Sequence, residues 1–150
     1  MKGYYLNNNE LNFNEVNFLE GKNKIFVSNL NLTKNLKIKN IDKLELNYFN
    51  NKKKLNDIKI SKYKDNFELT GNHYDGRLLV ENLLKGNLNN NFLKIFKNLN
   101  SEIVLDIDQF YLGDKSYLEK IVGKLIIKEN KIKSGNIDAY LNKKNKHSQL

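Results

Sequence analysis

The chain has 150 residues and a mass of 17.6 kDa, which suits one domain, and it lacks cysteine, so disulfides and thiolate metal sites are excluded. Its formal net charge is +9, with lysines spread over every segment. An AT-rich codon bias with a solvated face explains this charge, and a purposeful anion-binding patch is the alternative. No stretch reaches the ~18 apolar residues of a transmembrane helix, and the N-terminus has no apolar signal core.

Apolar and polar residues alternate along residues 11–71, which predicts antiparallel strands joined by turns rich in Asn, Lys and Gly. The segment KLELNYF, for example, places Leu44 and Leu46 on one face and charged residues on the other. The expected strands are 24–32, 36–41, 43–49, 57–63 and 66–71.

The period changes to that of a helix between about 75 and 99. Asp75 is placed to cap the N-terminus of a first short helix, and Gly86 is placed to end it. Arg77 lies in the first turn, where an anion can bind. A second apolar stripe over 92–99 predicts another short helix, and both need tertiary packing to persist.

Strands return over about 102–142, before a polar tail at 143–150. Alternation in EIVLDIDQFYL shifts phase between Ile107 and Phe110, which predicts a β-bulge near Asp108. A faint repeat relates FNEVNFLEG (13–21) to IDQFYLGDK (107–115), with apolar residues at the first, fourth and sixth places.

These patterns predict a mainly β fold with two short helices (α+β), built as a curved antiparallel meander that forms a groove. Two short helices cannot cover the apolar face of about eight to ten strands. Either the sheet closes on itself as a sandwich or barrel, or acyl chains fill the groove, at about 0.8 kcal/mol per buried methylene. The sequence leaves both open. The candidate lipid-facing residues are Leu44, Leu46, Ile58, Ile60, Phe67, Leu69, Leu105, Ile107, Phe110, Leu125 and Ile127.

No residue set indicates catalysis, a cofactor or a metal. Asp106 and Asp108 share the polar face of one predicted strand and Asp114 follows in a turn, so solvation or ion pairing explains them better than cation binding. His73 and His147 are too far apart for metal-ligand spacing. Phosphate-loop and nucleophile motifs are absent from the sequence, and an enzyme is not expected.

One arrangement resembles a known family. A strand ending in FELTG runs into DGRLL and returns as VLDIDQFYLGDKSYLEKIVGKL. This order resembles the AsmA/YhdP/TamB-like superfamily, in particular its AsmA-like conserved region, over roughly residues 10–142. The matching residues are Thr70, Gly71, Asp75, Leu78, Leu79, Leu105, Ile107, Phe110, Leu112, Leu118, Val122, Gly123 and Leu125.

The resemblance implies a non-enzymatic segment of a Gram-negative envelope protein that forms part of a hydrophobic β-groove for phospholipid transport or outer-membrane biogenesis. It further implies a periplasmic location, attachment to the inner membrane through an anchor missing from this chain, and phospholipid acyl chains as partners, without a cofactor. Two alternatives remain. One is a structural or adhesive β-domain with a closed core. The other is a basic module that binds nucleic acid or another anionic polymer, although a single arginine argues against base-specific reading.

Overall fold

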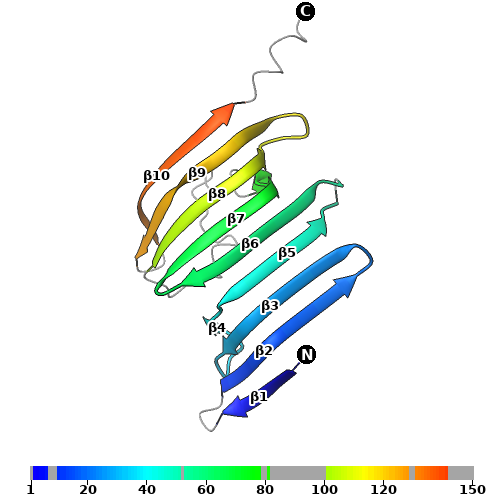
Figure 1. The fold of residues 1–150 in the computed structure, drawn as a ribbon, viewed down its shortest axis with the longest axis vertical. Coiled ribbons are helices and arrows are strands. Elements are labelled where there is room, and N and C mark those ends of the chain that lie inside the picture. Colours follow the sequence, from blue (N-terminus) through cyan, green and yellow to red (C-terminus); the bar gives the residue numbers. More distant parts are fainter. Residues whose placement is uncertain are drawn as a thin grey trace, which may run out of the picture.

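Ten strands form one open, mostly antiparallel sheet in the computed structural model, which describes residues 2–6, 10–51, 53–78, 81, 101–128 and 131–141 (Figure 1). Most strands run for seven residues or more, as the alternation in the sequence requires. The strands are β1 (Lys2–Leu6), β2 (Glu10–Glu20), β3 (Asn23–Leu32), β4 (Ile38–Asn40), β5 (Lys43–Phe49), β6 (Leu55–Tyr63), β7 (Asn66–Asp75), β8 (Ser101–Tyr111), β9 (Tyr117–Lys128) and β10 (Lys131–Leu141).

The strand order across the sheet is β1-β2-β3-β5-β6-β7-β8-β9-β10, with the short β4 paired to β3. All neighbours are antiparallel except β7 and β8, which are parallel. The expected meander is therefore interrupted once. A parallel pair needs a connection of a dozen or more residues, and residues 76–100 supply it.

The two predicted helices fall within this connection. Asp75 is the last residue of β7, Gly76 lies in neither a helix nor a strand, and Arg77, Leu78 and Glu81 have helical conformation. Residues 79, 80 and 82–99 and the predicted tail 143–150 lie outside the described residues. The mainly β character is confirmed, while no complete helix is present among the residues that the structure describes. In the same residues, no helix has the length and apolar character needed to cross a bilayer.

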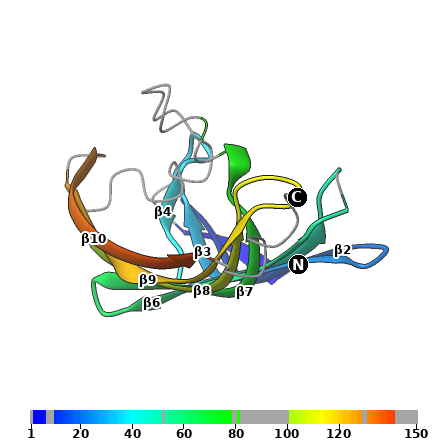
Figure 2. The same ribbon diagram turned by 90° about the horizontal axis from the view of Figure 1, so that it is seen from above.

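The core lies on one face of the sheet. Leu44, Ile60, Leu69 and Leu105 stand opposite one another on β5, β6, β7 and β8, and each is buried. The sheet is curved, and β4 lies on its concave side (Figure 2). Since Ile38 of β4 packs against the core, the apolar side chains occupy the concave side.

The phase shift predicted near Asp108 is present, because Ile107 and Phe110 are both buried although two residues lie between them, where strict alternation would place one. The irregularity extends beyond β8. Asn72 of β7 and Lys120 of β9 stand opposite Asp108 in the neighbouring strands. The register shifts at Asn72 where β7 pairs with β6, and at Lys120 where β9 pairs with β10. Three adjacent strands therefore carry one extra residue each, and their mutual register is kept.

The faint sequence repeat matches a repeated backbone feature. In β2 and β3, Phe13 pairs with Leu30 and Glu15 with Ser28, which leaves Asn14 opposite Asn29 at a second phase shift. Asn29 has a φ of 49°, and Lys120, at the equivalent place in the β8–β9 hairpin, has a φ of 53°. Both hairpins thus use a left-handed residue to change which side chains face the core.

Two glycines allow close approach of neighbouring strands. A Cβ at Gly71 would lie 2.5 Å from the Asp57 carbonyl oxygen, and one at Gly123 would lie 2.3 Å from the Asn136 carbonyl oxygen. Both contacts are with backbone, which cannot move aside cheaply. A Cβ at Gly113, in the β8–β9 turn, would have its nearest neighbour at 3.7 Å.

We expect Gly71→Ala and Gly123→Ala each to lower the free energy of unfolding by about 1–3 kcal/mol, because the added methyl group overpacks the strand pair. The control Gly113→Ala is expected to change it by under ~0.5 kcal/mol. Guanidinium denaturation followed by circular dichroism measures all three. Equal stability of the three variants would contradict the close strand approach.

Candidate functional site

The eleven apolar residues predicted to line the groove all belong to one core cluster on the same side of the sheet. Leu46 and Leu125 are half-buried, and the other nine are buried, with exposed fractions between 1% and 8%. The list of candidate lipid-facing residues omitted four further core residues. Ile103 and Ile121 continue alternations that the sequence shows. Ile41 ends the strand predicted for 36–41 but does not share a period of two with Ile38, and in the structure it lies between β4 and β5. The four residues are Val27, Ile41, Ile103 and Ile121.

Exposure on this face rises toward the edges of the sheet. Ile58 and Ile60 in central β6 are 2% and 1% exposed. Val16 and Ile25, on β2 and β3, are half-buried, and Phe18 is 53% exposed. Beyond the other side of the core, Leu125 of β9 is half-buried and Ile137 of β10 is 49% exposed. The surface of this face open to a ligand therefore lies on its flanks. We call Val16, Phe18, Ile25, Leu125 and Ile137 the flank residues.

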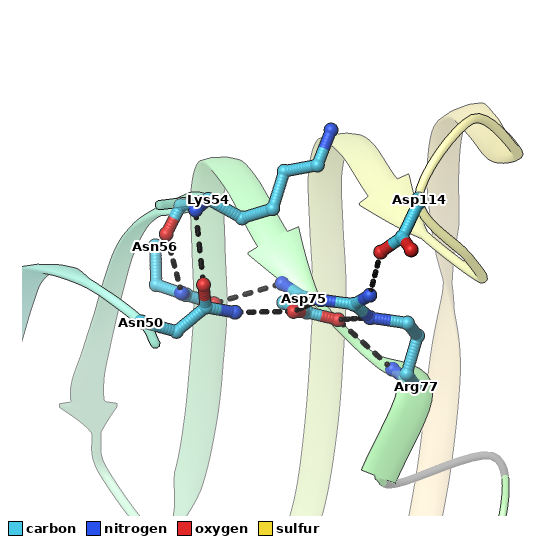
Figure 3. Close-up of polar contacts among 6 residues, drawn as sticks. All are labelled: Asn50, Lys54, Asn56, Asp75, Arg77 and Asp114. Carbon is cyan, nitrogen blue, oxygen red and sulfur yellow. Dashed lines mark hydrogen bonds and ion pairs between the residues drawn. The ribbon is translucent and has the colours of Figure 1, made fainter. Parts of the chain in front are cut away.

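A polar cluster holds one end of the sheet together (Figure 3). The Asp75 carboxylate, at the end of β7, accepts hydrogen bonds from the Arg77 guanidinium, with Nε–Oδ1 at 2.7 Å, and from the Asn50 amide. The same Arg77 pairs with Asp114 in the β8–β9 turn. Buried Asn56 accepts from the Asp75 backbone N at 2.8 Å and donates to the Lys54 carbonyl at 3.3 Å.

This cluster ties the β5–β6 turn, the end of β7 and the β8–β9 turn to one another. The Arg77 backbone N also donates to Asp75 Oδ1 at 3.3 Å, a contact of the kind made by helix-capping residues, while most of the helix predicted after Asp75 lies outside the described residues. The single arginine of the chain thus binds carboxylates of its own fold.

The electrostatics of the cluster follow from its partial burial. The hydrogen bonds from Arg77 hold the pKa of Asp75 below its usual value, and Asp75 in turn raises the pKa of Arg77. Nearby, burial raises the pKa of Tyr74 to about 12, and burial together with the charge of Asp75 raises the pKa of Tyr48. At neutral pH the cluster is therefore a charged pair beside neutral phenols.

The aspartates of VLDID lie on the polar face, as predicted. Asp106 and Asp108 are half exposed, and both pair with the ammonium group of Lys120, the Asp108 contact at 3.0 Å. Asp114 lies apart from them and pairs with Arg77. Among the described residues, no group of three potential metal ligands converges.

His73 lies in β7 and stacks on the ring of Tyr111, with centroids 6.5 Å apart. Its Nδ1 is buried without a hydrogen-bond partner in the structure. His147 lies outside the described residues. The His73 ring therefore packs against a neighbouring side chain of the sheet.

Comparisons with protein-family models, with curated proteins and with solved structures find no match.

We expect Arg77→Gln to lower the free energy of unfolding by about 1.5–3 kcal/mol, because it removes charge-assisted hydrogen bonds from a carboxylate whose side chain is 9% exposed. The matched variant Asp114→Asn removes the outer partner, which is 67% exposed, and should cost under ~1 kcal/mol. Urea denaturation at neutral pH measures both. A larger loss for Asp114→Asn would contradict the assigned roles.

The lowered pKa of Asp75 also makes stability depend on pH. The pair contributes fully above about pH 4, where the unfolded carboxyl is ionised, and this contribution is lost as pH falls through the lower folded pKa. Urea midpoints from pH 7 to pH 2 should therefore fall less steeply in Asp75→Asn than in the unmodified chain. Identical slopes in the two proteins would show that Asp75 does not hold this linkage.

Proposed function

We propose that this chain is a non-enzymatic segment of a hydrophobic β-groove that holds phospholipid acyl chains. The observation that carries the proposal is a single open sheet, curved, with one apolar face whose burial decreases toward both edges. An apolar face in water needs a cover. At the centre the face is buried, and on the flanks it has half-buried and exposed side chains that an acyl chain can cover.

The contact would be distributed over several strands. Phe18 stands opposite Ile25, and Ile25 stands opposite Leu46, so apolar side chains line the face continuously from β2 to β5. Each methylene removed from water contributes about 0.8 kcal/mol, so a few acyl carbons on this strip are enough for weak binding. The open edges β1 and β10 would let such a groove continue into further strands.

The wider context comes from the resemblance. In this proposal the chain belongs to an AsmA-like protein, lies in the periplasm and is attached to the inner membrane through a segment outside this chain. Gly71 and Gly123, which carry part of the resemblance, also have a steric role in close strand approach. The two short helices of 75–99 stay a prediction.

A structural β-domain with a closed core is the second candidate. It is favoured by the nine predicted groove residues that are already buried. In that case the flanks would be ordinary half-buried edges of the core, and no lipid would be bound. The two candidates differ only in what contacts the flank residues.

Photocrosslinking at neighbouring positions separates the two candidates. Ile25 packs against the core cluster, whereas Phe26 lies on the opposite face with the Lys43 ammonium 5.3 Å from its ring centroid. p-Benzoylphenylalanine is placed at either position, the protein is irradiated with phosphatidylethanolamine vesicles, and adducts are identified by mass spectrometry. We expect several times more phospholipid adduct at position 25 than at position 26.

The pair Val16 and Asn17 on β2 provides a second test with the same geometry, because these neighbours also alternate between the two faces. Equal labelling on both faces, or none on the apolar face, would contradict the groove and favour the closed core. Native mass spectrometry of the gently purified protein reports independently whether phospholipid is retained.

A further inference from the structure

Exposed apolar side chains gather at one end of the strands. Ten large apolar residues are exposed in the part of the chain that the structure describes, and five of them lie at neighbouring strand ends. We call these five the turn rim. They lie at the β2–β3 turn, the end of β5, the end of β7 and the end of β8, which are on the same side of the sheet (Figure 1). The turn rim consists of Phe18, Leu19, Phe49, Leu78 and Leu112.

Contacts connect the members of the turn rim. The Phe49 backbone N donates to Asn23 Oδ1 at 3.0 Å, which ties the end of β5 to the β2–β3 turn. Phe49 and Leu78 line the same surface depression, beside Arg77. The ion pair between Arg77 and Asp114 then joins this depression to the turn that begins at Leu112. These contacts therefore link the successive turns that carry the rim residues.

Lysines lie beside the turn rim. Lys22 and Lys24 adjoin Leu19, Lys53 and Lys54 follow Phe49, and Lys115 lies in the turn after Leu112. At the same end, Asp75 and Asp114 are engaged by Arg77. The other acidic residues of these turns are Glu20 and Glu81.

We propose that the turn rim docks on the surface of an anionic phospholipid bilayer. Side chains exposed to this degree, with Leu19 and Leu78 both at 71%, would enter the boundary between headgroups and acyl chains. The lysines beside them would contact anionic headgroups, an attraction that salt weakens. This docking uses strand ends, and Phe18 is the one rim residue that is also a flank residue of the concave face. The variants that test the docking therefore substitute Leu19 and Phe49, which are outside the flank residues.

Vesicle flotation tests the docking with the full chain. The probes are vesicles of three parts phosphatidylcholine to one part phosphatidylglycerol, and vesicles of phosphatidylcholine alone. We expect binding to the anionic vesicles that decreases as sodium chloride is raised, and weaker binding to the neutral ones. The double variant Leu19→Ser/Phe49→Ser should bind about tenfold more weakly, which corresponds to about 1.4 kcal/mol.

A matched control uses the opposite strand ends. Leu36 and Tyr63 are each 67% exposed there, so Leu36→Ser/Tyr63→Ser removes as much apolar surface and should leave binding unchanged. A second variant, Lys22→Gln/Lys53→Gln, keeps the apolar residues and should reduce binding to anionic vesicles only. Circular dichroism confirms that each variant is folded.

Three results would overturn the proposal. The unmodified chain could fail to float with anionic vesicles, the rim variant could bind as well as the unmodified chain, or the control variant could lose as much binding. Any of these results would rule out docking of the turn rim on an anionic bilayer. A failure of docking leaves the face-specific crosslinking at Ile25 unaffected, so the two proposals are separable.

Discussion

A sheet of one layer must hide one face from water, and most of this structure follows from that requirement. The centre of the concave face holds the best-buried side chains, Ile58, Ile60, Phe67 and Ile103, each with an exposed fraction of 1–2%. Burying a side chain of this size contributes roughly 1.5–3 kcal/mol, so these strands dominate the stability. The outer strands gain less, because Phe18 and Ile137 stay about half exposed on the same face. Stability and open apolar surface therefore vary in opposite directions across the sheet.

Local backbone features keep this face continuous while the sheet curves. The extra residues at Asn72, Asp108 and Lys120 change the phase of three adjacent strands together, so their cross-strand pairs stay matched. The polar cluster around Asp75 and Arg77 then fixes the turns at that end of the sheet. Loss of Arg77 would leave the Asp75 carboxylate partly buried without its cation, so the pair keeps these turns in one arrangement. The cluster lies beside the turn rim, because Asp75 and Arg77 line the same surface depression as Phe49 and Leu78.

Much of the fold could be predicted from periodicity. Alternation identified the strands and placed Leu44, Ile60 and Leu105 on one face, and it also placed Asp106 and Asp108 on the other. Period two fixes the face of a side chain but not the neighbour or the direction of its strand. The parallel pairing of β7 with β8 was therefore missed, and β1 lies before the strands predicted over 11–71, whereas β4 falls within the strand predicted for 36–41. The depth of burial was also not predictable, because it depends on what covers a face and not on the alternation itself.

The functional account depends on a gradient from a sealed centre to open flanks. In the two proposals, acyl chains contact the apolar strip at the flanks, and a bilayer contacts the basic apolar rim. Hydrogen–deuterium exchange of the unmodified chain tests the gradient directly, since protection follows local stability. Amides of β6, β7 and β8 should exchange slowest, with rates rising through β3 and β9 to β2 and β10. Uniform protection across all strands would contradict the account and indicate a core closed along the whole sheet.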